Sequence, residues 1–303
     1  MSSVVESINS VTRSASIFNA AIRFNFSCDQ ARRIQKPFCK FTRAFRTLES
    51  KAGLRLKRLT VYTCLFGDYQ GLVEPREAWA DCDFVCFTDR SNVDSNVWTV
   101  KTLKLSDSDR VRASRRPKIL PHYYLEHSIP SLYVDANIRI EKNPVTHLLP
   151  LLDKASFWAP RHFARDCIYD EAHECVVLGR ASVSAVKSEM TRYRALNIPS
   201  HAGLSENNVL LRAHGDPRVM DLMEQWWSFY EQGCGRDQLS LPVAVMQSGF
   251  SMSYLDTSSR DMSDAAIVRH EQHGRDQNPS LWRRVKQKWT ITRRRIAYRT
   301  LSF

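Results

Sequence analysis

Short apolar runs that lead into an acidic residue constrain the fold of this chain most strongly. Each is rich in β-branched or aromatic side chains, which is typical of a buried strand that enters a loop. Three such runs are Leu59–Phe66, Phe84–Thr88 and Ser131–Val134, which lead into Asp68, Asp89 and Asp135. A helix-like stretch over 112–126 precedes the third run, and another helix is expected to begin at Asp216-Pro217. Strands that alternate with helices predict an α/β fold, with a mostly parallel sheet flanked by helices.

The basic residues are concentrated near the two ends of the chain. The formal net charge is +12, but residues 1–58 hold 12 Lys/Arg against 3 Asp/Glu and residues 257–303 hold 11 against 4, whereas 59–256 hold 21 against 25. A nucleic-acid-binding domain usually carries its basic stripe on the folded body, so nucleic acid is the least favoured partner. We expect a poorly ordered basic leader over 1–57, a single folded domain over 58–256 and a basic tail over 257–303.

Apolar segments of the chain are short. No window approaches the unbroken run of about 18 apolar residues that a membrane-spanning helix needs, and the N-terminus has no compact apolar signal core. The protein is therefore expected to be cytoplasmic, neither integral to a membrane nor secreted. A transit peptide is a weaker alternative for the leader, because Glu6 and Asp29 interrupt its Ser- and Arg-rich composition.

The C-terminal tail has the composition of a basic amphipathic helix. Residues 281–303 hold eight Lys/Arg and no acid. Their apolar side chains recur close to helical intervals, at Trp282, Val285, Trp289 and Ile296. This pattern is typical of a helix that lies on an anionic membrane surface, so the tail is expected to make the protein peripheral to a membrane. A solvated basic tail without a partner is the alternative.

The eight cysteines form no CxxC pair, so reduced and mostly buried thiols are expected. Neither Cys82 with Cys86 nor the cluster of histidines and cysteines between 162 and 175 has the spacing of a closed structural zinc site. Zinc is therefore the less favoured interpretation of these residues.

Polar residues directly after strands are the candidates for chemistry, because ligands of open parallel sheets bind beyond the carboxyl ends of the strands. Asp135 and Asn137 offer hard oxygen ligands for Mg²⁺ or Mn²⁺, although such a triplet is also common in ordinary turns. Asp81 and Asp83 match an Asp-x-Asp motif more literally, but they precede their strand and are interpreted as turn or cap residues. Asp89 is expected either to contact a ribose or base or to end its strand in a turn.

An ordered set of motifs resembles a known family. The set consists of Val61–Tyr69, Cys82–Asp89, Arg116–His122, Leu132–Ile138, Arg165–Tyr169, Glu206 followed by Val209–Arg212, and Arg236–Gln238. In this order the motifs are similar to the plant mucilage-related and bacterial family of glycosyltransferase-like proteins (TOD/MUCI type), whose domain has a GT-A-like, Rossmann-like fold. The resemblance covers roughly residues 59–250 and neither tail.

The resemblance implies that Asp135 and Asn137 bind a sugar nucleotide and a divalent metal, Mn²⁺ or Mg²⁺. Asn137 stands where such enzymes usually carry a second Asp, and an amide supplies an oxygen without charge, so metal dependence stays open. Cationic side chains would then stabilise the departing diphosphate. Arg116 and Lys118 lie inside a matching motif and are expected to do so, whereas Arg115 is interpreted as a solvated residue at the start of a helix.

Glycosyl transfer also needs a carboxylate or imidazole near the reacting hydroxyl. By the resemblance, Asp237 in its Asp-Gln pair and Glu206 before an apolar strand are the catalytic candidates. Asp166, Glu171 and His214 are candidates for acceptor or sugar contacts, and each has a structural role as its alternative.

Together these observations predict a glycosyltransferase. It would move a sugar from a nucleoside diphosphate-sugar, with a UDP-sugar favoured, to a glycan or lipid-linked acceptor. The competing hypothesis is a non-catalytic surface- or nucleic-acid-binding module on a degenerate sugar-nucleotide fold. Asn137, in place of a second Asp, is the feature that keeps this hypothesis open.

Overall fold

The computed structural model describes residues 58–67, 71–104, 109–256, 258–271 and 281–298. All described residues belong to one unit, Lys57–Phe303. The leader expected over residues 1–57 lies outside the described residues.

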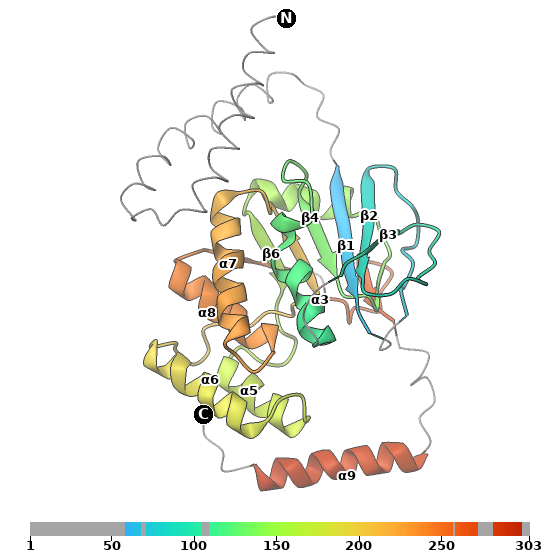
Figure 1. Ribbon diagram of the computed structural model, residues 1–303. Coiled ribbons are helices and arrows are strands. Elements are labelled where there is room, and N and C mark those ends of the chain that lie inside the picture. Colours follow the sequence, from blue (N-terminus) through green and yellow to red (C-terminus); the bar gives the residue numbers. More distant parts are fainter. Residues whose placement is uncertain (1–57, 68–70, 105–108, 257, 272–280, 299–303) are drawn as a thin grey trace, which may run out of the picture. The chain divides into compact units, whose positions relative to one another are not determined.

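A seven-stranded sheet forms the core of the described unit (Figure 1). The strands are β1 (Leu59–Leu65), β2 (Cys82–Thr88), β3 (Thr99–Thr102), β4 (Ser131–Val134), β6 (Phe157–Pro160), β7 (Val209–Arg212) and β8 (Ser253–Leu255). Their order in the sheet is β3-β2-β1-β4-β7-β6-β8. Neighbouring strands are parallel except where β7 pairs with β4 and with β6. The expected α/β class, with a mostly parallel sheet flanked by helices, is confirmed.

Strand β1 shows why the apolar runs become central strands. All seven of its residues are buried. Leu59 and Val61 belong to one apolar cluster, whereas Tyr62 and Cys64 belong to another, because successive side chains of a strand point to opposite faces. A strand that is covered on both faces needs apolar residues at nearly every position.

Helices α3 (Arg110–Ile119), α7 (Pro217–Glu231) and α8 (Asp237–Ser248) pack on the Tyr62 side of the sheet (Figure 1). Helix α7 begins as the sequence predicts, since the Asp216 side chain accepts a hydrogen bond from Arg218 N at 3.0 Å and Pro217 occupies the first turn. Trp226 and Trp227 are buried in the cluster between helix and sheet. They are core residues, as expected.

Helix α3 ends earlier than the sequence suggested. It stops at Ile119 rather than near Glu126, and a short 3-10 helix, η1 (Pro121–Tyr123), follows it. Pro121 explains the difference, because a proline has no N–H to donate and disfavours helical backbone at the residue before it. The early end places Lys118 in the last turn of α3.

The remaining elements surround this core. Helices α5 (Ile168–Val177) and α6 (Val183–Ala195) share a third apolar cluster with residues of α8. Strands β5 (Ile138–Ile140) and β9 (Val268–His270) form a separate antiparallel pair, and α4 (Pro144–His147) and η2 (Leu149–Asp153) lie between β5 and β6 in the chain. Because β9 pairs with β5, ordered structure continues past residue 256, the boundary that the charge distribution suggested.

The helix expected in the C-terminal tail is present as α9 (Leu281–Ala297). Arg295 Nη2 lies 3.0 Å from Glu174 Oε1 of α5, and His173 Nε2 lies 3.0 Å from the carbonyl O of Tyr298. Two large apolar side chains of α9, Trp289 and Ile296, are exposed. Within the described ranges, no helix combines the length and apolar character needed to cross a membrane.

Candidate functional site

The carboxyl ends of the parallel strands gather the main candidate residues at one edge of the sheet. Asp135 directly follows β4. Strand β7 runs the opposite way, so its beginning lies at the same edge, and Asp135 N donates to the carbonyl O of Asn208 at 2.9 Å. Glu206 N donates to the carbonyl O of Pro160, at the end of β6, at 2.9 Å. Asp135, after the end of β4, and Glu206, just before β7 and beside the end of β6, therefore lie at the same edge of the sheet.

Lys118 is a buried lysine between two carboxylates. Its side chain is only 2% exposed, and its Nζ lies 2.7 Å from Asp237 Oδ2 and 3.5 Å from Asp135 Oδ1. The sheet fixes its backbone, because the carbonyl O of Lys118 accepts hydrogen bonds from Tyr62 Oη at 3.1 Å and from Arg212 Nη2 at 2.8 Å. Ion pairs at its ammonium and hydrogen bonds to its backbone carbonyl therefore fix Lys118 in place.

Asp237 opens α8, and its side chain is buried. Burial would raise its pKa, but the charges of Lys118, Arg115 and Arg236 outweigh burial and hold the pKa of this carboxyl below its usual range. Arg115 Nε lies 3.6 Å from Asp237 Oδ1. The carboxylate is thus ionised at neutral pH, where it is a weak base but a strong hydrogen-bond acceptor.

Asp135 is the more accessible of the two carboxylates that Lys118 contacts. Its side chain is 34% exposed, compared with 5% for Asp237. Tyr133 Oη donates to Asp135 Oδ1 at 2.7 Å, which is also the oxygen nearest Lys118. Both contacts go to one oxygen of Asp135, and the carboxylate faces the end of the sheet where a ligand can reach it.

Asn137 meets a histidine from the C-terminal part of the chain. Asn137 Nδ2 lies 2.7 Å from His270 Nε2, because β9 pairs with β5 immediately after Asn137. Asp135, Asn137 and His270 together offer a carboxylate, an amide oxygen and an imidazole nitrogen. These residue types can bind a divalent cation such as Mn²⁺ or Mg²⁺, but His270 Nε2 is hydrogen-bonded to the Asn137 amide, and the set carries the charge of only one carboxylate.

Glu206 lies in the segment that leads into β7. Its side chain is buried, and its Oε1 lies 3.1 Å from Arg260 Nε. Asn208 Nδ2 donates to Glu206 Oε2 at 3.4 Å and to Ser259 Oγ at 2.8 Å. The carbonyl and the side chain of Asn208 therefore connect Asp135, Glu206 and the segment after β8.

Residues 89–262 match the TOD1/MUCI70 glycosyltransferase-like domain family. This range is more than half of the chain and contains Lys118, Asp135, Glu206 and Asp237. The chain belongs to this family. No match is found among curated protein sequences.

Glycosyltransferases are among the solved structures with a similar fold. Mouse xyloside xylosyltransferase 1 in its apo form has a TM-score of 0.42 and 10% identity over 67% of this chain and 86% of that one. The galactosyltransferase LgtC, in complex with donor and acceptor sugar analogs, has a TM-score of 0.40 and 9% identity over 77% and 95%. The bifunctional glycosyltransferase WbbM has a TM-score of 0.37 and 10% identity over 71% and 45%.

The basic residues of α3 divide between two faces in this member of the TOD1/MUCI70 family. Lys118 and Arg115 point to Asp237, whereas the guanidinium of Arg116 lies over the Trp227 ring, 5.6 Å from its centroid. The structure thus brings Arg115, interpreted from sequence as solvated, to the acidic cluster and places Arg116 beside α7. Because α3 contains Pro117, the sequence alone does not predict which of its side chains face the acidic cluster.

Asp89 lies in a turn at the carboxyl end of β2. Its Oδ1 accepts a hydrogen bond from Gly67 N at 2.9 Å, and its Oδ2 lies 3.5 Å from Arg110 Nε. Gly67 has a φ of 65°, a conformation that suits glycine. Asp89 therefore connects the loops after β1 and β2, at the same edge of the sheet as Asp135.

The other three candidates occupy different surroundings. Glu171 is buried in α5, where its Oε2 lies 2.6 Å from Arg165 Nε and 3.6 Å from His162 Nε2. Asp166 is exposed, and its Oδ1 lies 2.7 Å from His201 Nδ1. His214 follows the carboxyl end of the reversed strand β7, so it lies at the opposite edge of the sheet from Asp135.

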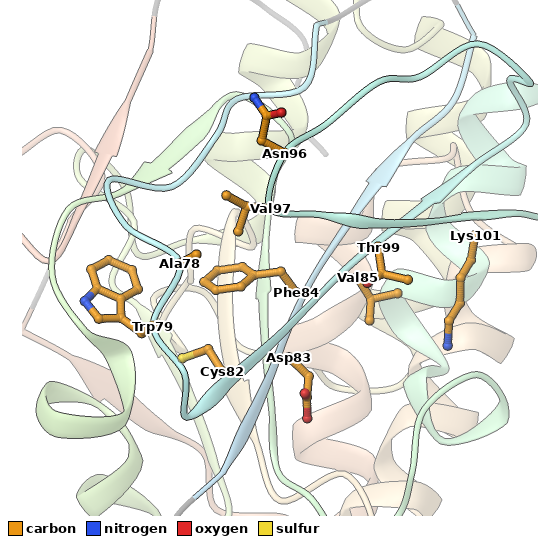
Figure 2. Close-up of a pocket in the computed structure, with 10 residues that line it drawn as sticks. All are labelled: Ala78, Trp79, Cys82, Asp83, Phe84, Val85, Asn96, Val97, Thr99 and Lys101. Atoms are coloured by element: carbon orange, nitrogen blue, oxygen red, sulfur yellow. The ribbon is translucent and has the colours of Figure 1, made fainter.

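The literal Asp-x-Asp pair lies at the amino ends of the strands. Leu59 N, at the start of β1, donates to the carbonyl O of Asp81 at 3.2 Å, and both carboxylate oxygens of Asp81 lie 3.2 Å from Asn143 Nδ2. Asp83 forms an ion pair with Arg58. A hollow of about 490 Å³ beside β2 and β3 includes Asp83 among its lining residues, but neither Asp135 nor Asp237 (Figure 2).

Sequence reasoning missed His270, Ser259 and Arg260. All three lie beyond residue 256, in the segment that was assigned to a basic tail. Arg260 and His270 are solitary polar residues without a recognisable motif, and only the pairing of β9 with β5 brings His270 to Asn137. The short run of apolar residues at 266–268 is the one local signal that could have indicated a strand there.

Proposed function

We propose that this protein transfers a sugar from a nucleoside diphosphate-sugar, with a UDP-sugar favoured, to the hydroxyl group of a glycan or lipid-linked acceptor. The observation that carries the proposal is the buried Lys118, whose ammonium lies between Asp135 and Asp237 at the carboxyl edge of the sheet. Family membership supports transfer of a sugar, and the position of the cluster, beyond the ends of parallel strands, is where ligands of such sheets bind.

The cationic side chains would serve the leaving group. Lys118 and Arg115 are fixed by Asp237, so little reorganisation is needed when negative charge develops on the departing diphosphate. A Mn²⁺ or Mg²⁺ ion held by Asp135, Asn137 and His270 would add further positive charge on the same group. Asp237, with its lowered pKa, would accept hydrogen bonds from the hydroxyls of the donor sugar rather than take up a proton.

Glu206 would act on the acceptor side. Its carboxylate is buried beside Arg260, whose side chain is 59% exposed. An acceptor hydroxyl that reaches this edge can donate to Glu206, while the guanidinium of Arg260 holds the carboxylate in place. Asp237 would thus contact the donor sugar, and Glu206 would contact the acceptor hydroxyl.

Calorimetry with UDP, with and without Mn²⁺, tests the donor part of the proposal. UDP is expected to bind in at least one of the two conditions. Arg115→Met should weaken binding about 10- to 100-fold, the effect of losing a hydrogen bond to a charged group, while Arg116→Met provides a matched control on the same helix. If only Arg116→Met lost affinity for UDP, the diphosphate contact would belong to Arg116, as the sequence indicated, and not to Arg115.

The competing function is a non-catalytic binding module. The amide at Asn137, which already contacts His270, is the observation that favours it. Absence of UDP binding in both calorimetric conditions would contradict the transferase and favour this module.

A further inference from the structure

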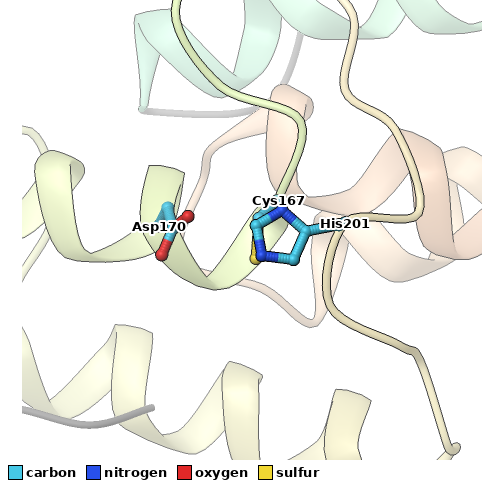
Figure 3. Close-up of side chains that lie close together, drawn as sticks. All are labelled: Cys167, Asp170 and His201. Atoms are coloured by element: carbon cyan, nitrogen blue, oxygen red, sulfur yellow. The ribbon is translucent and has the colours of Figure 1, made fainter.

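Three potential metal ligands converge away from the Lys118 cluster. Cys167 and Asp170 come from the start of α5, and His201 comes from the loop after α6 (Figure 3). One donor atom from each lies within 4.8 Å of the other two. Cys167 is buried, whereas Asp170 and His201 are exposed, so the group opens to solvent on one side.

The backbone around α5 brings two of these side chains together. Cys167 occupies the N-cap position of α5 with extended backbone, φ −121° and ψ 127°. Asp170 lies three residues later, and side chains at this separation share one face of a helix. The Cys167 side chain accepts no capping hydrogen bond. Its sulfur is thus placed beside the Asp170 carboxylate without serving the helix itself.

A strained loop presents the third side chain. His201 has a φ of 58°, a left-handed conformation that is uncommon for residues other than glycine. Gly203 N donates to the carbonyl O of Asp166 at 2.9 Å, which fixes the loop against the residue that precedes Cys167. Strain of this kind is retained where a side chain has to be presented in one direction.

Asp166 orients the imidazole of His201. His201 Nδ1 lies 2.7 Å from Asp166 Oδ1, which leaves Nε2 as the ring nitrogen available to a ligand. Figure 3 shows the ring lying over the sulfur of Cys167, with the carboxylate of Asp170 to one side. A carboxylate that holds one nitrogen of a histidine while the other binds a metal is a recurrent arrangement in metal sites.

We propose that Cys167, Asp170 and His201 bind a zinc ion, with Asp166 as a positioning residue. A thiolate with an imidazole and a carboxylate suits zinc rather than magnesium or calcium, which prefer oxygen ligands alone. In a tetrahedral zinc site the ligand atoms lie roughly 3.5 Å apart, and the exposed side chains of Asp170 and His201 can close to that separation by rotation. Three protein ligands leave the fourth position to water.

The bound ion would order the segment that leads to Glu206. His162 N donates to the carbonyl O of Leu204 at 2.9 Å, so the chain from His201 runs directly into the backbone pairing beside β6. Zinc would join this segment to the start of α5. The site is separate from Asp135, Asn137 and His270, so zinc binding does not depend on the proposed transfer reaction.

Cobalt(II) titration of the full-length chain tests the proposal, because a cobalt–thiolate bond gives a charge-transfer absorption that a bond to oxygen or nitrogen does not. We expect one Co²⁺ to bind with this absorption and to be displaced by Zn²⁺. Cys167→Ser should abolish the absorption, and His201→Gly, which tolerates the left-handed backbone, should abolish tight binding. Asp166→Asn should weaken affinity about 10- to 100-fold, as for other residues that orient metal-bound histidines.

Two variants outside the cluster serve as controls. Cys234→Ser removes the least buried of the described free cysteines, and His147→Gln removes an exposed histidine. Both should bind Co²⁺ with the charge-transfer absorption of the parent chain. The proposal is overturned if the parent chain shows no thiolate–cobalt absorption, or if Cys167→Ser keeps it. Circular dichroism of each variant without metal separates loss of the site from loss of the fold.

Discussion

At the scale of single residues, the central feature is a buried cation between two carboxylates. Lys118 lies within 2.7 Å of Asp237 and 3.5 Å of Asp135, and such a group is costly to bury unless its partners are present. The sequence indicated Lys118, Asp135 and Asp237 as separate candidates. It could not indicate that they touch, because the contact depends on the packing of α3 and α8 against the end of β4.

Removal of the lysine should therefore affect both stability and activity. Lys118→Met leaves Asp237 buried without its nearest cation, so the free energy of unfolding should fall by about 3–5 kcal/mol, the usual cost of breaking a buried ion pair from one side. Sugar transfer should be lost as well. Denaturant unfolding measures the first effect. The double variant Lys118→Met/Asp237→Asn should recover stability but not transfer, and a double variant no more stable than Lys118→Met would contradict the pairing.

His214 lies away from the candidate site, and it tests how burial changes the pKa of a histidine in this protein. Burial, followed by the charge of Arg212, lowers its pKa to about 3. An unfolded histidine takes up a proton near pH 6.5, whereas the folded protein keeps this one neutral. Its contribution to stability is therefore complete above pH 6.5 and is lost as the pH falls from there towards 3.

The variant His214→Leu should reduce that pH dependence. The free energy of unfolding of the parent chain should fall more steeply between pH 6 and pH 4, by up to about 1.4 kcal/mol per pH unit, the value for one proton. Urea unfolding at a series of pH values gives the two slopes. Equal slopes for the parent and the variant would show that His214 titrates normally.

At the scale of elements, the apolar runs predicted β1, β2 and β4 because both faces of these strands are buried. The charge pattern placed the folded boundary too early to include β9, since the three residues Val268–His270 give too short a signal to outweigh the basic residues around them. The sequence also could not predict which side chains of α3 face the acidic cluster. Arg115 and Arg116 are adjacent in sequence, yet only the packed structure shows which one reaches Asp237.

Helix α9 carries the prediction of membrane attachment. Trp289 and Ile296 are 59% and 70% exposed, and the seven-residue interval between them places them on one face of the helix. With the basic residues of 281–303, this face should bind vesicles that contain anionic lipid, with an affinity that falls as salt increases. Trp289→Ser/Ile296→Ser should sediment with such vesicles markedly less than the parent chain.

The matched control for this experiment is Met262→Ser, which removes an apolar side chain of similar exposure, 70%, outside α9. It should bind vesicles as the parent chain does. Equal sedimentation of all three proteins would exclude an apolar contribution of α9 to attachment.

At the scale of the whole molecule, the fold brings residues from distant parts of the sequence to one edge of a sheet. Lys118 comes from α3, Asp135 from the end of β4, Glu206 from the start of β7, Asp237 from α8 and His270 from β9. The direction of β7 decides which polar residues share this edge, because it brings Glu206 to Asp135 and takes His214 to the other end. The proposed donor and acceptor sites both lie at this edge.

The most direct test of the proposed donor site is donor hydrolysis by Asp135→Ala, measured with a panel of UDP-sugars. Asp83→Asn is the control, since the two carboxylate side chains have similar exposure, 34% and 39%, but lie at opposite edges of the sheet. We predict that the parent chain hydrolyses at least one donor, that Asp135→Ala loses about 100-fold or more of the turnover with little change in melting temperature, and that Asp83→Asn retains it. Near-normal turnover by Asp135→Ala would contradict the assignment of the donor site.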